Sequence, residues 1–315
     1  MKYSIIIPVY KNQESIPRLL DTLAYINKEL EEELEAVFVV DGSPDFCFSM
    51  LREALPLLPY QARLIALSRN FGSMAAIRTG LAAVQGVFVS VMAADLQEPP
   101  GLVLQCFRAL DNDECDVAVG TRISRNDSFI TKITSRLFWW FYKRYIMPDM
   151  PEGGVDIFAC NQKFKTQLLT LEESRSSLIA LIFWLGFRRK LIGYERQARQ
   201  EGRSAWTFRK KVDYMMDSIF AFTDLPLRLL LRVGMLGTIV SFLLGVVVLW
   251  GRLTGYIDVP GYATTVLLIL FLGALNLFAL GLVGCYAWRA YENTKSRPTS
   301  VIAISLSNSL EDPND

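Results

Sequence analysis

Two uncharged apolar runs near the C-terminus constrain this chain more than any other feature of its sequence. The first extends from Val233 to Gly251 and the second from Tyr262 to Trp288, and neither contains Asp, Glu, Lys or Arg. As a helix, 19 residues span roughly 28 Å, about the thickness of the hydrocarbon core of a bilayer. A buried hairpin of a soluble protein is the alternative, but soluble cores rarely contain uncharged runs of this length. We therefore predict a two-helix transmembrane domain over 233–288.

Basic residues lie on one side of these predicted helices. Arg228 and Arg232 precede the first run, whereas Arg289, Lys295 and Arg297 follow the second. Because cytoplasmic flanks are enriched in Lys and Arg, both the N-terminal domain and the tail are predicted to face the cytoplasm. This arrangement predicts an integral protein of the plasma (inner) membrane.

The two ends of the chain give further expectations. The opening stretch MKYSIIIPVY has too short an apolar run for a signal peptide. It is predicted to be the first strand of a cytoplasmic domain. The tail, 289–315, is polar from Ser296 onward and is predicted to be disordered.

Residues 1–212 are predicted to form one α/β domain. Up to about residue 160, apolar strand-like segments alternate with helical ones, which is typical of a mostly parallel sheet with helices on both faces. The first helical segment is predicted over 15–30, with Ser15 as its N-cap. Ligands of such sheets bind at the carboxyl ends of the strands. Polar residues collect at these predicted ends, at 10–14, 41–45, 68–72, 95–98 and 121–122.

Two stretches between the sheet and the apolar runs are both aromatic and basic. Residues 135–147 and the juxtamembrane segment 213–232 suit helices that lie in the membrane interface. For 135–147 an ordinary helix facing the core is the alternative. Helices of this kind could also pair copies of the chain into a homo-oligomer.

The composition excludes several kinds of chemistry. There is no histidine, so a Ser–His–Asp triad, a zinc site with His ligands and a His general base are impossible. The five cysteines are dispersed, without a Cys-x-x-Cys pair, which favours free thiols in a reducing compartment. The net charge is +1, so the overall charge gives no reason to expect a nucleic acid partner.

An acid and an amide two residues apart form a candidate metal site. Asp95 and Gln97 follow the apolar run VFVSVMAA, and on an extended chain their side chains would point to the same side. Both carry hard oxygen ligands of the kind that suits Mg²⁺ or Mn²⁺ beside a diphosphate. A loop without a metal is the alternative for this pair taken alone.

An ordered set of motifs sets this pair in context. IIIPVYKNQESI, VVDGSPD, SRNFGSMAAIRTGL, MAADLQEPP and VAVGTR follow one another, and GGVDIFACNQKF and YERQARQEGRSAWTFRKKV come later. This set resembles the GT-A glycosyltransferases of family 2, and among them the polyprenyl-phosphate glycosyltransferases. The resemblance covers nearly the whole chain. It implies a Rossmann-like GT-A domain, a nucleotide-sugar donor, a Mg²⁺ or Mn²⁺ ion and a polyprenyl-phosphate acceptor.

The resemblance also implies roles for individual residues. The donor nucleotide would be held by Pro8, Tyr10, Asn12, Asp41, Ala94 and Arg122. The metal would be held by Asp95, which is also a catalytic candidate, and by Gln97. The acceptor phosphate would be held by Arg199, Arg203 and Ser204. Asp156 is the candidate that would orient the nucleophile or act as a base; a turn residue after two glycines is its alternative.

The sequence departs from the family pattern at four positions. Ala93 and Val40 stand where acids are common, Asn12 stands where Glu is common, and Ala205 stands where Lys is common. Loss of the first acid weakens the expected metal site. Arg203 or Arg209 could replace the missing lysine.

Residues 188–211 form a basic stretch with nine Lys or Arg against Glu195 and Glu201. A solvated surface is one reading, and a collar for anionic lipid headgroups is the other, because the stretch precedes the membrane segments. Guanidinium groups can bind a phosphate with two parallel hydrogen bonds.

These observations predict inverting transfer of a hexose from a nucleotide sugar to a polyprenyl phosphate. UDP-glucose with undecaprenyl phosphate is the first expectation and GDP-mannose the second. A processive polysaccharide synthase is a rival, but it should carry Gln-x-x-Arg-Trp, and here Ser204 stands in place of the Trp. A non-catalytic membrane scaffold is a further rival, supported only by Ala93.

Overall fold

The structure of the chain is a computed structural model that divides into two units. The first unit comprises Met1–Lys211 with Pro298–Asp315, and the second comprises Val212–Arg297. The described residues are 1–31, 33–123, 140, 142–144, 147–151, 155–171, 177–195, 216, 218–219, 223, 225–254, 261–295 and 297–308.

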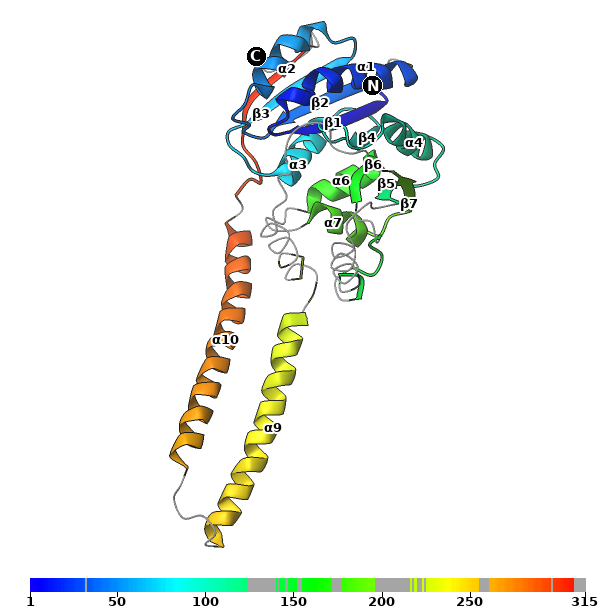
Figure 1. The fold of residues 1–315 in the computed structure, drawn as a ribbon. Helices are drawn as coiled ribbons and strands as arrows, with labels where there is room; N and C mark the ends of the chain where they lie inside the picture. The colour runs from blue at the N-terminus through cyan, green and yellow to red at the C-terminus, as the bar shows by residue number, and fades with distance from the viewer. Residues whose placement is uncertain are drawn as a thin grey trace. The chain divides into compact units, whose positions relative to one another are not determined.

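Among the described residues, an eight-stranded mixed sheet forms the centre of the first unit (Figure 1). Its spatial order is β7-β5-β6-β4-β1-β2-β3-β8, with β1 to β4 mutually parallel and with β6 and β8 antiparallel to their neighbours. The strands are β1 Tyr3–Val9, β2 Leu34–Val40, β3 Gln61–Leu67, β4 Phe88–Val91, β5 Val117–Arg122, β6 Val155–Asn161, β7 Arg189–Tyr194 and β8 Ile302–Ser307. The predicted α/β class is therefore confirmed.

Helices cover both faces of this sheet (Figure 1). α1 Ile16–Glu29, α2 Cys47–Ala54 and α4 Pro100–Asp111 pack together on one face, and α3 Ser73–Ala83 and α6 Gln162–Thr170 pack together on the other. The remaining helical elements of this unit that are described with bounds are η1 Gln13–Ser15, η2 Leu55–Leu57 and α7 Leu178–Trp184.

The alternation of side chains along β1 explains this layering. Ile5 and Ile7 are fully buried in the core that contains α1, α2 and α4, and the intervening Ile6 faces α3 because neighbouring strand residues point to opposite faces. A Cβ on Gly80 of α3 would lie 2.3 Å from Cγ2 of Ile6. Only a glycine lets α3 approach the sheet so closely at this point, and α3 is the helix that follows the loop after β3.

The C-terminal tail departs from the prediction. Residues 302–307 were expected to be disordered, but they form β8, which pairs antiparallel with β3 (Figure 1). The reason is visible in the sequence, since Ile302, Ile304 and Leu306 alternate with small residues at the period of a strand. The expected disorder is therefore wrong for this segment, which completes one edge of the sheet.

The second unit contains two long helices. α9 is Leu225–Leu253 and α10 is Tyr262–Thr294, and together they cover both predicted apolar runs. Within the described residues, one stretch, Phe271–Glu292, has the length and apolar character to cross a membrane. The two-span arrangement therefore stays a prediction.

The predicted interfacial segments lie largely outside the described residues. Of 135–147, the structure describes 140, 142–144 and 147, and Tyr142 is buried with 1% of its surface exposed. Of 213–232, it describes 216, 218–219, 223 and the start of α9. The interfacial role of both segments remains a prediction.

Candidate active site

The order in which the chain adds strands to the sheet reverses between β1 and β4. From β1 the chain builds outward to β2 and β3, and it then returns to place β4 on the other side of β1. Loops that leave neighbouring parallel strands in opposite directions open a crevice at the carboxyl ends of those strands, and α/β proteins bind ligands there. The two loops at this switch point begin at Tyr10 and Met92. Tyr10 and Asn12 of the predicted donor residues lie in the first loop, and Ala94, Asp95 and Gln97 lie in the second.

Three of the predicted donor residues lie at the end of β1 and in the loop that follows it. Pro8 lies within β1 opposite Val39, and Tyr10 follows the strand in a half-buried position. The backbone N–H of Tyr10 donates to Oδ1 of Asn12 at 3.2 Å. Lys11 lies between them with φ 55°, a left-handed backbone that is uncommon for a non-glycine residue. The loop therefore turns sharply at the switch point.

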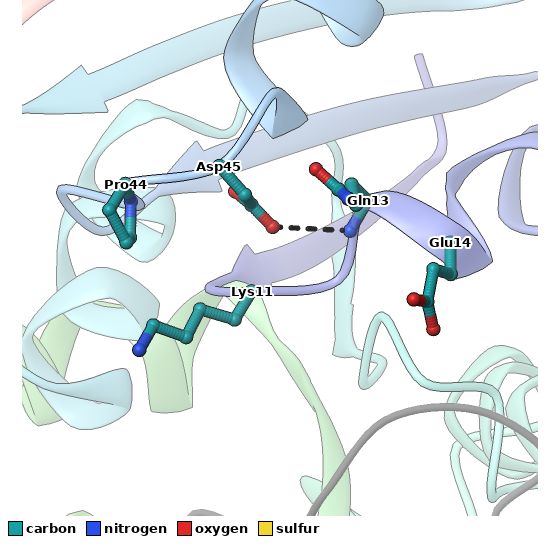
Figure 2. Close-up of a pocket in the computed structure, with 5 residues that line it drawn as sticks. All are labelled: Lys11, Gln13, Glu14, Pro44 and Asp45. Carbon is teal, nitrogen blue, oxygen red and sulfur yellow. Dashed lines mark hydrogen bonds between the residues drawn. The ribbon is translucent and has the colours of Figure 1, made fainter.

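Side chains join this loop to the loop after β2 (Figure 2). The N–H of Lys11 donates to Oγ of Ser43 at 2.8 Å, and the N–H of Gln13 donates to Oδ2 of Asp45 at 3.4 Å. In the other direction, the N–H of Phe46 donates to Oε1 of Gln13 at 3.2 Å. These bonds border an open pocket of about 290 Å³ lined by Lys11, Gln13, Glu14, Pro44 and Asp45.

Asp45 is the acceptor at the centre of this junction. Burial works against its ionisation, but hydrogen bonds from Ser43, Cys47 and Gln13 outweigh burial and hold the pKa of Asp45 below its usual range. Burial, assisted by the neighbouring Asp45, raises the pKa of the Cys47 thiol to about 12. At neutral pH the pair is therefore a carboxylate and a neutral thiol, and the thiol donates to Oδ2 of Asp45 at 3.1 Å.

Asp41, a predicted donor residue, is turned toward the loop after β3. Its side chain is buried, with 2% of the residue exposed. Oδ1 accepts the N–H of Phe71 at 2.7 Å, and Oδ2 accepts the N–H of Gly72 at 2.8 Å. Both carboxylate oxygens thus organise residues 68–72, the β3–α3 loop, at the entrance to α3. A contact between Asp41 and a nucleotide remains a prediction.

The loop after β4 carries the predicted metal residues in a shape that the sequence did not indicate. β4 ends at Val91, four positions before Asp95. Leu96 has φ 53° and a buried side chain with 6% exposed, so the chain turns between Asp95 and Gln97. The expectation that both side chains point to one side of an extended strand is therefore wrong. The N–H of Gln97 donates to Oδ1 of Asp95 at 3.4 Å within this turn.

The left-handed backbone of Leu96 is a strained conformation held by its surroundings. Such a conformation costs on the order of 1–3 kcal/mol, and it persists where packing enforces it, often at ligand sites. Here the buried Leu96 side chain anchors the turn in the core. The turn is also tied to the loop after β1, because Oγ of Ser15 donates to the carbonyl oxygen of Ala94 at 2.8 Å. Ser15 occupies the N-cap of α1 as expected, but its hydroxyl makes this bond and no capping bond.

The chemistry of the Asp95 turn fits a hard divalent cation. Within the described residues, no group of three or more Cys, Asp or Glu side chains could hold a metal ion. Mg²⁺ usually takes one or two protein carboxylates and completes its shell with water and substrate phosphates. A carboxylate and a carboxamide oxygen on one fixed turn meet that requirement if a diphosphate supplies the remaining ligands.

Arg122 and Asp156 lie at the same edge of the sheet. Arg122 is the last residue of β5 and Asp156 is the second residue of β6, an antiparallel neighbour. Thr121 pairs with Val155 whereas Gly120 pairs with Ile157, so Asp156 is the extra residue of an irregularity in the ladder. Bulges of this type redirect side chains and are frequent beside active sites. The Asp156 side chain itself lies outside the described residues.

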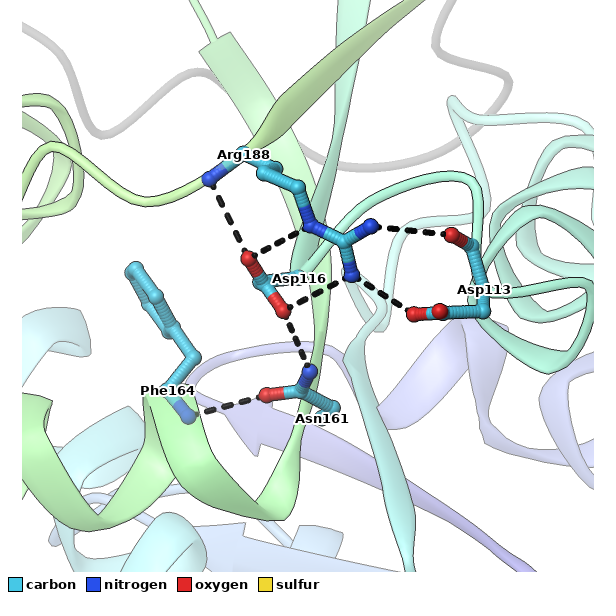
Figure 3. Close-up of polar contacts among 5 residues, drawn as sticks. All are labelled: Asp113, Asp116, Asn161, Phe164 and Arg188. Carbon is cyan, nitrogen blue, oxygen red and sulfur yellow. Dashed lines mark hydrogen bonds and ion pairs between the residues drawn. The ribbon is translucent and has the colours of Figure 1, made fainter.

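A second polar cluster fixes the opposite edge (Figure 3). The Arg188 guanidinium pairs with Asp113 at 2.6 Å and with Asp116 at 3.2 Å, which joins the start of β7 to the start of β5. The bond from Arg188 holds the pKa of Asp116 below its usual range. Asn161 donates to Asp116 at 3.0 Å and caps α6 by accepting the N–H of Phe164 at 2.9 Å. This cluster supports the sheet at the end away from the crevice.

Comparison with known proteins identifies the family. Residues 4–169 match the family described as Glycosyl transferase family 2. The chain belongs to that family. It is 32% identical to the putative glycosyltransferase CsbB of Bacillus subtilis, over 95% of this chain and 90% of that protein. Membership of glycosyl transferase family 2 makes the chain a glycosyltransferase.

Two further relatives carry more specific names. The chain is 33% identical to the undecaprenyl-phosphate 4-deoxy-4-formamido-L-arabinose transferase of Proteus mirabilis, over 94% of this chain and 91% of that protein. It is 27% identical to the bactoprenol glucosyl transferase of Shigella phage SfX, over 96% of this chain and 99% of that protein. Both similarities extend well beyond the family 2 region.

The structure of this family 2 transferase brings the donor and metal candidates to one edge of the sheet. Pro8 lies near the end of β1 and Tyr10 and Asn12 follow it, Asp41 and Ala94–Gln97 follow the neighbouring strands, and Arg122 ends β5. The acceptor candidates Arg199, Arg203 and Ser204 lie outside the described residues. Sequence reasoning placed Gln13, Ser43 and Asp45 among the polar residues at the strand ends but missed their role, which is to join two loops of the site. The signal for them was present, because Ser43 and Asp45 stand in the turn sequence DGSPD directly after a strand.

Proposed function

We propose that this transferase moves a hexose from a nucleotide sugar to a polyprenyl phosphate at the cytoplasmic face of a membrane. The observation that carries the proposal is similarity along more than nine tenths of the chain to two transferases named for undecaprenyl phosphate and bactoprenol. Glucose from UDP-glucose is the favoured donor, in keeping with the glucosyl transferase relative. GDP-mannose is the alternative, and the arabinose relative adds a formamido-arabinose donor to the candidates.

The donor is proposed to bind in the crevice at the switch point. Pro8, Tyr10, Asn12 and Asp41 would border its nucleoside, and Ala94 and Arg122 would border its diphosphate. Asp95 and Gln97 would hold Mg²⁺ or Mn²⁺ against the diphosphate. The ion would supply positive charge beside the leaving group, which is the form of stabilisation that phosphate departure needs.

The absence of histidine is compatible with this reaction because of its acceptor. A lipid phosphate is already an anion at neutral pH, so it needs little deprotonation before it attacks the anomeric carbon. Attack from the face opposite the departing diphosphate inverts that carbon. Asp156 is proposed to orient the attacking phosphate or to accept its remaining proton, since its backbone lies at the irregularity in β6 on the edge that carries Arg122.

The acceptor phosphate is proposed to meet the part of the basic stretch that follows β7, residues 195–211. Arg199, Arg203 and Ser204 would contact it, with guanidinium groups making parallel hydrogen bonds to its oxygens. The lipid chain would lie in the membrane beside α9 and α10. Two spans, with both termini in the cytoplasm, are proposed from the uncharged runs and their basic flanks.

Mass analysis of the lipid product tests this function. Purified full-length protein with Mg²⁺ and undecaprenyl phosphate would be offered UDP-glucose, GDP-mannose and a UDP-linked formamido-arabinose in separate reactions. We expect one donor to give a glycosyl-phosphoryl lipid, with the glucosyl product favoured. Omitting the lipid is the control, and in that case only slow donor hydrolysis is expected. Absence of any sugar-lipid with all donors would overturn the proposal, and a polymeric product would favour a processive synthase.

A further inference from the structure

The last described segment of the chain lies along the whole length of β3. Residues 298–308, which we name the C-terminal strap, follow α10 in the sequence and contain β8. Within the strap, β8 pairs antiparallel with β3 from Arg63 to Leu67 (Figure 1). The strap therefore closes the edge of the sheet that would otherwise end at β3.

One end of the strap is fixed at the start of β3. Oδ1 of Asn308 accepts the N–H of Ala62 at 2.8 Å. Its Nδ2 donates to the carbonyl oxygens of Leu55 at 3.3 Å and Tyr60 at 3.0 Å. These three bonds lie at the amino end of the strand, away from the crevice.

The other end of the strap is fixed at the point where β3 enters the site. The N–H of Ser68 donates to the carbonyl oxygen of Val301 at 2.9 Å. Oγ of Ser300 lies 2.6 Å from Oγ1 of Thr79 on α3. Because the Thr79 hydroxyl also donates to the carbonyl oxygen of Ala75 at 2.9 Å, Ser300 donates in the bond between them. The strap is thus hydrogen-bonded both to the start of the β3–α3 loop and to α3, the helix that follows this loop.

The same loop is held from its other side by Asp41. Its carboxylate accepts the N–H groups of Phe71 and Gly72 at the end of the loop. The loop is therefore held at its start by Val301, at its end by Asp41, and through α3 by Ser300. It is positioned jointly by Asp41 and by the C-terminal strap.

The strap contributes little to the apolar core. Val301, Ile302 and Ile304 are 46%, 51% and 43% exposed, and β8 is an edge strand. An element with few buried apolar contacts opens more easily than the sheet it covers. Leu306 packs against the core, and the hydrogen bonds of Ser300 and Val301 are made to α3 and to the β3–α3 loop.

We propose that Ser300 and Val301 are positioning residues that fix the β3–α3 loop for binding of the nucleotide donor. The inference rests on the proposed function only in placing the donor at this edge of the sheet. Neither residue touches the substrate. Each acts by limiting the movement of a loop that borders the donor site.

Matched variants at the two ends of the strap test this inference. In the full-length protein, Ser300→Ala removes the bond to Thr79 at the crevice end, and Asn308→Ala removes three bonds at the far end. A lost neutral hydrogen bond corresponds to a change of about 2- to 10-fold. We expect Ser300→Ala to raise the UDP dissociation constant, and the KM for the donor, by that factor with kcat and the lipid KM unchanged. Asn308→Ala should lower the unfolding temperature at least as much as Ser300→Ala does, but it should change UDP affinity less than Ser300→Ala does.

Two results would overturn the proposal. One is UDP affinity that falls in proportion to thermal stability in both variants, because that is the behaviour of a strap that only stabilises the fold. The other is unchanged UDP affinity in Ser300→Ala. Ser300→Thr, which keeps the hydroxyl, should restore UDP affinity. UDP binding needs no lipid. Failure of transfer to polyprenyl phosphate would therefore contradict the proposed acceptor, but the comparison of UDP affinity between the Ser300 and Asn308 variants would still be valid.

Discussion

Gly42 lies so close to Arg69 that a Cβ on Gly42 would come within 2.3 Å of the Arg69 carbonyl carbon. Gly42 also has φ 56°, a conformation that other residues rarely adopt. The loop after β2 and the loop after β3 are therefore in direct backbone contact at the edge of the crevice. Asp41, the preceding residue, binds the same β3–α3 loop through its carboxylate. Asp41 and Gly42 together determine the relative position of two loops of the proposed donor site.

Replacing Gly42 by Ala should damage both stability and donor binding. The left-handed backbone alone costs an Ala roughly 1–2 kcal/mol, and the contact with Arg69 adds to this. We expect the unfolding temperature of the first unit to fall by about 2–8 °C and UDP affinity to decrease, as measured by thermal denaturation and calorimetry. Gly101→Ala in α4 is the control, because a Cβ there meets nothing within 4 Å. A Gly42→Ala protein with unchanged UDP affinity would show that contact between these loops is irrelevant to the donor.

Asp95→Asn should nearly abolish sugar transfer while the fold is retained. Asp95 is the one acid in the strained turn beside the expected diphosphate, and an amide cannot supply its negative charge to a metal ion. Loss of one such stabilising group costs about 100-fold or more in kcat. The measurement is transfer rate at saturating Mg²⁺, with circular dichroism to verify the fold.

The matched control for this variant is Asp111→Asn. Asp111 is the last residue of α4, and its carboxylate pairs with Lys2 at 2.8 Å on the surface. The same chemical change at this position should leave transfer at the wild-type rate. If Asp95→Asn also transfers sugar at close to that rate, the metal site has been assigned to the wrong residue.

The Asp45 junction predicts a specific dependence of stability on pH. Hydrogen bonds hold the pKa of Asp45 in the folded state below its usual range, so its contribution to stability is present above the unfolded pKa of about 3.9 and is lost as pH falls through the folded pKa. Asp45→Asn should therefore be less stable than wild type at pH 6–7, and the difference should shrink below about pH 4. Thermal denaturation across pH 3–7 measures this. A difference that stays constant over the range would contradict a role for the ionised carboxylate.

The parallel half of the sheet could be predicted from the sequence because its signals are local. Buried strands such as IIIPV and AVFVV are short apolar runs bounded by turn residues, and the polar residues that follow them mark the carboxyl edge. The end of β4 could not be read in this way. The run VFVSVMAA stays apolar through Ala94, but β4 ends at Val91 and the chain turns at Ala94–Asp95, where the N–H of Leu96 donates to the carbonyl oxygen of Ala93 and its side chain packs in the core. Hydrophobicity alone does not distinguish a buried strand from a buried turn.

Contacts that join distant segments were also beyond the sequence. β8 and β3 are more than 230 positions apart in the sequence, and no local sequence pattern predicts that β8 pairs with β3. The alternation in VIAISLS is the pattern of a strand, but the expectation of disorder rested on the polar character of the tail from Ser296 onward and passed over this segment. The hydrogen bonds that both Asp41 carboxylate oxygens accept from the β3–α3 loop likewise depend on the tertiary structure. A resemblance can suggest that an acid matters, but only the fold shows which groups it binds.

The positions of the basic residues predict the topology of α9 and α10. A cysteine introduced at Asp258, in the short connection between the two apolar runs, should be labelled by a membrane-impermeant maleimide added to intact cells. A cysteine introduced in the C-terminal tail at Thr299 should be labelled only after the membrane is permeabilised. Both should be made in a background without Cys285, which is exposed in α10. The reverse pattern of labelling would contradict the predicted two-span topology.

Arg199→Ala should separate the acceptor from the donor. Arg199 follows β7, the last sheet strand before α9 in the sequence, whereas Asp41 and Asp95 follow strands at the centre of the sheet. A charge-assisted hydrogen bond to phosphate contributes roughly 1.5–3 kcal/mol. Losing it should raise the KM for lipid phosphate, or lower turnover, by about 10- to 150-fold.

Donor binding by Arg199→Ala should change little, since the diphosphate is proposed to be held by the metal ion and Arg122. The two measurements are UDP-glucose binding in the absence of lipid and transfer rate as a function of undecaprenyl phosphate concentration. Arg18→Ala is a suitable control, because it removes an exposed guanidinium from α1 and should alter neither. Weakened nucleotide binding with an unchanged lipid dependence would place Arg199 in the donor site. The basic stretch would then have to act on the diphosphate of the donor, and the acceptor phosphate would need other ligands.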